Sequence, residues 1–355
     1  MHETSARRRF LTLIAAIGVA SAACAVEPAW EAANPVVPLP VPPLGSEIDL
    51  AALPDPPTPE RVRLGRWLFY DTRLSADDTV ACATCHRPEH AFSEPTPVST
   101  GIGGQTGTRK APSIVNQAQT LFPHFFWDGR AASLAEQALG PIANPIEMGH
   151  QPAALVAKLS AIEGYAPYFE EAFGSPGVTG ERIARALVSY EQTRMSGNSP
   201  WDRWRYERDE AAVPDAVRRG HDLFFGKAGC RPCHAGNHFT DSRFHNLGIG
   251  WDEEERTLAD EGRAAVTGDP GDRGRFKTPS LREVTKHPPY MHDGSLATLR
   301  EVVAHYNRGG IPNPNLDVRI EPLGLTDAEI DALVAFLGAL EGEGYLDTAP
   351  VAFPE

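Results

Sequence analysis

Two short motifs in the sequence combine cysteine and histidine at one fixed spacing. The pattern Cys-x-x-Cys-His occurs twice, as Cys82, Cys85 and His86 and again as Cys230, Cys233 and His234. In this pattern each thiol adds across a vinyl group of a haem, and the adjacent histidine reaches the iron. A zinc knuckle would need four ligands close together, and a thioredoxin-like redox pair would not need the following histidine. The sequence therefore predicts two covalently bound c-type haems, with His86 and His234 as iron ligands.

The side of each iron opposite the histidine decides function, because a six-coordinate haem mainly carries electrons whereas an open one can bind peroxide. Tyr306 and Pro141 take equivalent positions, each twelve residues after the glycine of an Asp-Gly pair. A capping box at 298–301 starts a helix that places Tyr306 over the second haem. Proline has no ligating side chain, so the first haem is expected to be open. In the alternative reading Tyr306 is a core aromatic, with Met291 or His292 as the ligand, or no ligand at all.

The segments around the two motifs repeat. Gly65-Arg-Trp-Leu-Phe-Tyr precedes the first motif, and Gly220-His-Asp-Leu-Phe-Phe precedes the second. Further on, Trp127-Asp128-Gly129 has its counterpart in His292-Asp293-Gly294, and from the Asp-Gly pair onward the two copies align without a gap. Two such blocks in the same order indicate an internal duplication. We expect two cytochrome c-like haem domains that divide near residue 211.

Most of the chain has the residue spacing of helices. A proline at the first helical position predicts a helix from Pro59 towards Phe69, and apolar residues recur at helical spacing over 133–139, 152–162 and 182–194. A capping box at 326–329 predicts a C-terminal helix. Sustained period-two alternation is absent from the sequence, so no large sheet is expected. The expected fold is mainly α, with a signal peptide at 1–25, a Pro-rich leader at 26–57, an N-terminal peroxidatic haem domain at 58–210 and a C-terminal electron-transfer haem domain at 211–355.

Taken together, the motifs resemble the bacterial dihaem cytochrome c peroxidase family and, within it, the MauG-like subgroup. The similarity spans roughly residues 58–340 and includes, besides the two haem motifs, Phe126-Trp127-Asp128-Gly129-Arg130, Gln137, Gly140-Pro141, Glu147-Met148 and Pro289-Tyr290-Met291-His292-Asp293-Gly294. The resemblance implies an all-helical pair of domains, with the peroxidatic haem in the N-terminal half. It also implies that Gln137 and Glu147 lie in the distal pocket and that Trp127 lies between the haems.

Three positions depart from the peroxidase pattern. Ile102 stands where a loop histidine of the peroxidases can occupy the distal site until reduction releases it. Tyr306 replaces the usual methionine of the second haem, and both changes are shared with MauG-like members. Lys110 replaces an asparagine whose side chain binds an inter-domain calcium ion. Because an ammonium group cannot ligate a cation and could instead substitute for it, calcium is left as an open question.

The chemistry of the implied side chains agrees with this resemblance. Splitting peroxide requires a proton to move from one oxygen to the other, which the Glu147 carboxylate can carry, and the Gln137 amide can hydrogen-bond the oxygens without a change of charge. Each residue also has a plainer reading: Glu147 as a surface carboxylate, Gln137 as a helix-surface amide and Trp127 as packing. The other histidines, including His90, His124, His150 and His245, are interpreted as structural or solvated.

Charge and the first residues limit the partners and the location. The 355 residues carry a formal net charge of −14, which excludes nucleic acid and anionic lipid as partners. Arg7-Arg8-Arg9 and the apolar stretch 11–25 predict a signal peptide, export to the periplasm and no membrane span, because the stretch is shorter than a spanning helix. Cys24 would be discarded with the signal. A lipid anchor at Cys24 is the alternative, although Ser21 stands where a lipobox usually has leucine.

Three functions are compatible with these patterns. The first is a peroxidase that reduces hydrogen peroxide at the N-terminal haem, with electrons arriving through the C-terminal haem from a small periplasmic cytochrome or copper protein. The second is a MauG-like oxidation of residues on a partner protein. The third is a dihaem cytochrome that only transfers electrons, and the open N-terminal site argues against it. We favour the peroxidase.

Overall fold

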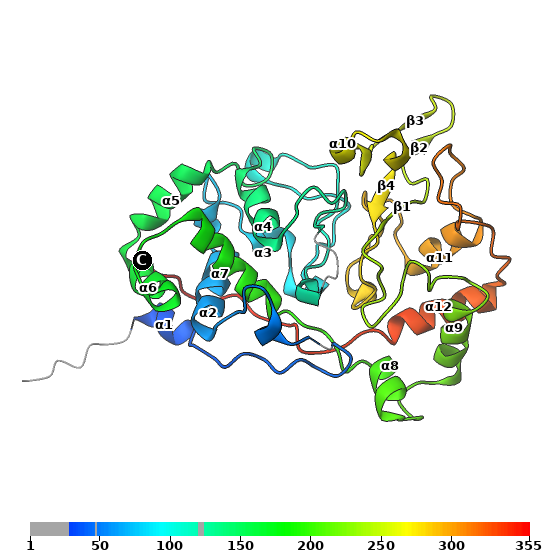
Figure 1. Cartoon of the computed structure of the whole chain (residues 1–355), viewed down its shortest axis with the longest axis horizontal. Coiled ribbons are helices and arrows are strands. Elements are labelled where there is room, and N and C mark those ends of the chain that lie inside the picture. Colours follow the sequence, from blue (N-terminus) through cyan, green and yellow to red (C-terminus); the bar gives the residue numbers. More distant parts are fainter. Residues whose placement is uncertain (1–27, 47, 120–123) are drawn as a thin grey trace, which may run out of the picture.

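The computed structural model describes residues 28–46, 48–119 and 124–355, and its architecture is mainly helical (Figure 1). The predicted signal peptide at 1–25, Cys24 included, lies outside the described residues. In chain order the α-helices are α1 (Ala29–Ala33), α2 (Pro59–Tyr70), α3 (Cys82–Cys85), α4 (Leu134–Ala143), α5 (Pro152–Ser160), α6 (Ala166–Phe173), α7 (Gly180–Gln192), α8 (Pro200–Asp202), α9 (Asp215–Phe225), α10 (Ala264–Thr267), α11 (Leu299–Asn307) and α12 (Asp327–Gly338). Among these described helices, none is long and apolar enough to cross a membrane.

The strands are few and short. β1 (Phe244–Asn246) pairs antiparallel with β4 (Arg275–Lys277), and β2 (Trp251–Asp252) pairs antiparallel with β3 (Thr257–Leu258). Within the described ranges the structure holds only these two-stranded sheets, as the lack of period-two alternation predicted. Both sheets lie in the C-terminal half of the chain (Figure 1).

The helices predicted from the sequence are confirmed, with small shifts at their ends. The clearest signals are the capping residues, because a side-chain oxygen at the first position satisfies a backbone N–H that has no partner inside the helix. Thr58 accepts a hydrogen bond from the Arg61 backbone at the start of α2. Complete capping boxes begin α11, at 298–301, and α12, at 326–329.

Each half contains one pair of crossing helices with a glycine at the contact. α2 packs against α7 in the N-terminal half, and α9 packs against α12 in the C-terminal half. A Cβ atom on Gly65 would overlap the backbone of Ala186, and a Cβ atom on Gly220 would overlap the backbone of Ala332. The helices approach this closely because the glycines have no side chain. The same contact therefore occurs in both halves.

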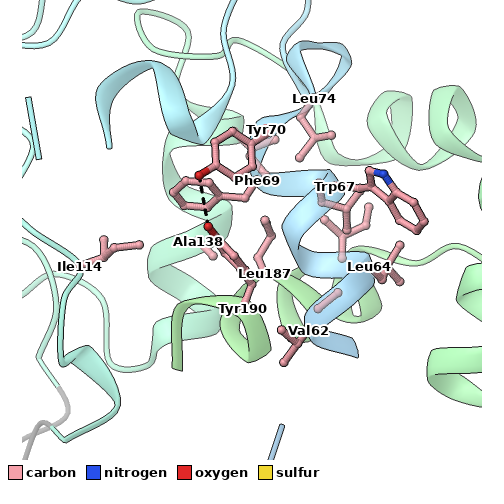
Figure 2. Close-up of a cluster of buried hydrophobic side chains, with 14 of the residues drawn as sticks. Val62, Leu64, Trp67, Phe69, Tyr70, Leu74, Ile114, Ala138, Leu187 and Tyr190 are labelled. Carbon is pink, nitrogen blue, oxygen red and sulfur yellow. Dashed lines mark hydrogen bonds between the residues drawn. The ribbon is translucent and has the colours of Figure 1, made fainter. Parts of the chain in front are cut away.

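An apolar core surrounds each crossing. In the first core, Phe69 and Tyr190 face each other from α2 and α7, and the Tyr190 hydroxyl donates to the Tyr70 hydroxyl at 3.3 Å (Figure 2). In the second core, the Phe336 ring of α12 lies 5.0 Å from the Phe224 ring of α9, measured between centroids. Both cores are rich in aromatic rings, which bury a large apolar area per residue.

The Pro-rich leader contacts both halves. The Asn34 side chain donates to the Arg63 backbone carbonyl of α2 at 3.0 Å, and the Arg282 guanidinium donates to the Gly45 carbonyl at 3.2 Å. Arg282 also forms a fully buried, two-pronged ion pair with Asp202 of α8, at 2.5 and 2.8 Å. The leader thus contacts the N-terminal half at Asn34 and the C-terminal half at Gly45.

The C-terminal segment returns to the N-terminal half. After α12 the chain runs back towards α6, where the red C-terminus lies in Figure 1. The Trp67 indole donates to the Ala352 carbonyl at 3.2 Å, and the Gly164 backbone N–H donates to the Glu355 carbonyl at 2.7 Å. Tyr345 is buried in the first core. The last residues of the chain therefore complete the half that is formed by its first helices.

The helix crossing can be tested with two glycine substitutions. Gly65→Ala should lower the free energy of unfolding by roughly 1–3 kcal/mol, because the added methyl group overlaps the Ala186 backbone and the helices must separate. Gly180→Ala is the matched control, since a Cβ atom there meets open space at the start of α7. The control should be neutral or slightly stabilising, as alanine is the better helix former. Denaturant unfolding of the haem-loaded proteins measures both, and equal losses would contradict the role of the crossing.

Candidate functional site

The two motif histidines have the same geometry. His86 directly follows α3, and its Nδ1–H donates to the Phe92 carbonyl at 2.9 Å. The Nδ1–H of His234 donates to the Phe239 carbonyl at 2.8 Å. A carbonyl oxygen can only accept, so each Nδ1 carries the hydrogen and each Nε2 keeps its lone pair. Burial lowers the pKa of both imidazoles, which favours the neutral form that binds a metal.

The four motif cysteines are free thiols in this fold. Cys82 and Cys85 lie one helical turn apart in α3, and Cys230 and Cys233 form a similar turn after α9. Burial raises the pKa of Cys82 to about 12, that of Cys85 to about 11 and that of Cys230 to about 12. Cys82, Cys85 and Cys230 therefore favour the protonated thiol, and none of the four cysteines forms a disulfide. This donor set fits a c-type haem in each half.

One cavity connects the two halves. Its lining includes His86 and Gln137 from the N-terminal half, His234 and Tyr306 from the C-terminal half, and Trp127. Most of the lining area is apolar, as the flat macrocycle of a haem requires. The structure thus brings together all the predicted site residues that lie outside the two cysteine pairs, except Glu147.

Tyr306 lies on α11 beside the second motif. Burial raises the pKa of its phenol, and the Cys230 and Cys233 thiols raise it further. Both cysteines line the same cavity as Tyr306. The alternative ligands also line the cavity, but the His292 ring stacks flat on Phe276, with centroids 3.6 Å apart.

Pro141 lies inside α4, at the position of the first half that corresponds to Tyr306 in the repeat. It is not among the residues that line the cavity in the described chain. Its carbonyl accepts a hydrogen bond from the Met148 backbone at 3.2 Å, which folds the loop after α4 back on the helix.

Glu147 is in that loop, at the edge of the first site. The Asn144 side chain donates to its carboxylate at 3.0 Å, and burial raises its pKa while the Arg130 cation opposes the rise. The carboxylate in turn contributes to the raised pKa of Cys85, which places it on the motif side of the loop. The Ile102 backbone donates to the Glu147 carbonyl at 2.9 Å, so the segment that lacks the loop histidine is held against this residue.

Trp127 joins the halves. Its indole N–H donates to the Lys110 carbonyl at 2.8 Å, and its own carbonyl accepts from the backbone of Lys277, on β4, at 2.8 Å. Next to it, the Arg109 guanidinium pairs with Asp128 at 2.6 Å and with Asp260 of the C-terminal half at 2.6 Å. Hydrogen bonds and an ion pair therefore fix the indole at the boundary.

The Lys110 side chain is buried at the same boundary. Its ammonium group donates to the backbone carbonyls of Glu94 and Thr96, the latter at 3.3 Å. Burial lowers its pKa to about 8. Its backbone N–H donates to the His292 carbonyl at 2.8 Å, so the residue also contacts the second half.

Two residues near the cavity were not singled out in the sequence. His245, interpreted there as structural or solvated, lines the cavity between Asp317, at 2.7 Å from Nδ1, and Asp241, at 3.0 Å from Nε2. Burial lowers its pKa, but hydrogen bonds to Asp241, to the Cys233 thiol and to Asp317 outweigh this effect and raise the pKa to about 10. Asp241, four positions before His245, was the feature of the sequence that could have indicated this pairing. The other residue is Glu191, which a comparison of the two repeated segments could have singled out.

Comparison with known proteins identifies the family that this chain resembles. Residues 59–211 match the family model described as "Di-haem cytochrome c peroxidase". The chain is 41% identical over 297 residues to the methylamine utilization protein MauG of Methylorubrum extorquens, covering 83% of this chain and 82% of the relative. It is 34% identical over 288 residues to the cytochrome c551 peroxidase of Nitrosomonas europaea, covering 81% and 82%.

Solved structures agree with these relatives. A MauG-like protein associated with microbial copper homeostasis superimposes with a TM-score of 0.77 at 33% identity, over 90% of this chain and 98% of the other. The diheme peroxidase BthA from Burkholderia thailandensis superimposes with a TM-score of 0.71 at 26% identity, over 90% and 96%. The chain therefore belongs to the dihaem cytochrome c peroxidase family and is a haem-dependent oxidoreductase of the peroxidase type.

Proposed function

We propose that the protein is a periplasmic dihaem c-type cytochrome that reduces hydrogen peroxide at the N-terminal haem with electrons that enter through the C-terminal haem. One haem would be attached through Cys82 and Cys85 and bound by His86, and the other through Cys230 and Cys233 and bound by His234. The halves at 58–210 and 211–355 would be duplicated haem domains. One observation carries the proposal: the two positions that correspond in the repeat carry different residues. Tyr306 lines the cavity beside the second motif, whereas Pro141 has no side chain that could bind iron.

A haem in each half would supply redox-active iron, open to peroxide in the first half and closed by Tyr306 in the second. The surrounding side chains would do the remaining chemistry. Glu147 would hold and move the peroxide proton, and its raised pKa brings the carboxyl group closer to the range in which it can both accept and donate. Gln137 would hydrogen-bond the peroxide oxygens from the cavity wall.

The inter-domain cation would be replaced by a side chain. Lys110 places an ammonium group on two backbone carbonyls, the kind of oxygen ligand that calcium also uses. We therefore infer that the protein needs no calcium at this boundary.

The second candidate function is MauG-like oxidation of a partner protein. The 41% identity to a methylamine utilization protein MauG and the tyrosine in place of methionine support it. The two functions differ in what consumes the oxidising equivalents. Steady-state peroxide turnover with a reduced small cytochrome or copper protein, compared with peroxide-dependent reaction against a periplasmic extract, separates them.

The inequality of the haems can be measured directly. Electron paramagnetic resonance of the ferric protein should show one high-spin signal, from the first haem, and one low-spin signal, from the second. Two low-spin signals would show that a side chain closes the first iron, and the peroxidase proposal would then fail. Addition of stoichiometric peroxide to the ferric protein should also change the Soret band without prior reduction, because Ile102 cannot act as the inhibitory loop ligand.

Glu147→Gln tests the proton-transfer role. The variant keeps shape and polarity but cannot accept a proton, so the reaction with peroxide should slow by roughly 10²- to 10⁴-fold, with both haem spectra intact. Glu163→Gln, an exposed position, is the control for the change of charge. A rate equal to that of the control would assign Glu147 to the surface.

Trp127→Phe separates electron relay from packing. Phenylalanine keeps most of the apolar area but is much harder to oxidise than an indole. Stopped-flow spectra should show that the first haem still reacts with peroxide while rapid oxidation of the second haem is lost. Trp204→Phe, at a tryptophan that packs against the second core and lies outside the cavity lining, is the control. Oxidation of both haems at the wild-type rate would leave Trp127 as packing.

A further inference from the structure

A buried carboxyl group faces the cavity in the N-terminal half, and one of its oxygens has no hydrogen-bond partner among the described residues. Glu191, near the end of α7, is 5% exposed and lines the cavity. Its Oε2 atom makes no hydrogen bond within the described structure. Glu191 contributes to the raised pKa of the Cys82 thiol, so the carboxyl group lies on the side of the first haem motif.

The internal repeat shows what the second half has at this position. Gly65 meets Ala186 and then Tyr190 on α7, and Gly220 meets Ala332 and then Phe336 on α12. The next residue along each helix is Glu191 in the first half and Leu337 in the second. Both line the cavity, and Leu337 is 7% exposed. The same position therefore carries a carboxyl group at one haem site and an isobutyl group at the other.

A carboxyl group is a poor choice for packing alone. Burying a polar group without a hydrogen bond costs free energy, and burying an ionised one costs more. Leucine fills the equivalent site without this penalty. The carboxyl group is therefore expected to act on what the cavity holds.

The electrostatic surroundings leave Glu191 free to respond to the haem. Burial alone raises its pKa, to about 8, and no charged side chain on the neighbouring helices contributes to that shift. Arg66 of α2 and Arg194, just after α7, pair with Asp347 instead. The Cys82 thiol is the titratable group that it faces, and it would become a thioether when haem is attached.

We propose that Glu191 lowers the reduction potential of the first haem relative to the second, through a carboxyl group that faces the first haem where Leu337 faces the second. Removal of an electron from a haem leaves an added positive charge, which a nearby carboxylate stabilises and an alkyl group does not. A lower potential favours the more oxidised states that reaction with peroxide requires. The inference deepens the proposed function and rests on it.

The test is a potentiometric titration of the complete haem-loaded protein, in which an electrode supplies the electrons through mediators and spectra report each haem. Glu191→Gln keeps the shape and polarity but cannot ionise. In the wild type the first-haem potential should fall between pH 6 and pH 9, because the carboxyl group loses its proton as the pH passes its raised pKa. In Glu191→Gln this part of the decrease in potential should be absent. At pH 9 the first-haem potential of the variant should therefore be higher than that of the wild type.

Two controls make the result specific. The second haem of the same molecule should keep its potential in the variant, and Glu170→Gln, at an exposed position on α6, should leave both potentials unchanged. Glu191→Leu should raise the first-haem potential at pH 9 as Glu191→Gln does. Equal first-haem potentials in wild type and Glu191→Gln at pH 9, or equal shifts at both haems, would overturn the proposal. The spin-state measurement fails or succeeds independently of these potentials, so failure of the proposed function would be recognised separately.

Discussion

Both halves of the molecule depend on a point where two helices meet backbone to backbone. The contact needs a glycine on one helix. The residue four positions after that glycine lies on the same helix face, so the crossing also fixes where this residue lies. Gly65 is followed by Phe69, whose ring centroid lies 6.5 Å from that of His86, and Gly220 is followed by Phe224, at 6.3 Å from His234. The position of each predicted iron ligand thus follows from a crossing of two helices. Larger residues at the crossing would separate the helices and displace the aromatic wall behind the histidine.

Around the two motif histidines, the halves share their main contacts. The histidines, their backbone acceptors and the crossing glycines have counterparts in both halves. Two differences concern the cavity: Tyr306 lines it whereas its counterpart Pro141 does not, and the lining residue Leu337 of the second half corresponds to the lining residue Glu191 of the first. Two halves that share a helix crossing can therefore provide two chemical environments without a change in that crossing, because the residues that form the crossing are not the residues that face the cavity.

The sequence predicted what depends on local patterns. Helix caps such as Thr326 rest on a few neighbouring residues, and the structure has them as expected. Haem attachment at the two motifs and the role of Tyr306 as an iron ligand stay predictions. The sequence did not predict that His245 lies between two aspartates, since one of them, Asp317, is 72 residues away in the chain. It also did not predict that Glu147 lies outside the cavity lining, because a loop conformation, and not residue spacing, sets that distance.

The return of the C-terminal segment has a consequence for the order of folding. A chain is synthesised from its N-terminus, and domains generally fold as they emerge. Here the core around α2 includes Tyr345, and the Trp67 indole is satisfied by the Ala352 carbonyl, so the first half reaches its final packing only after the second half has been made. The contact between Trp67 and Ala352 spans 285 residues of sequence, and such non-local closure is slow. The N-terminal half therefore stays incomplete until the last residues of the chain are available, although its helices are made first.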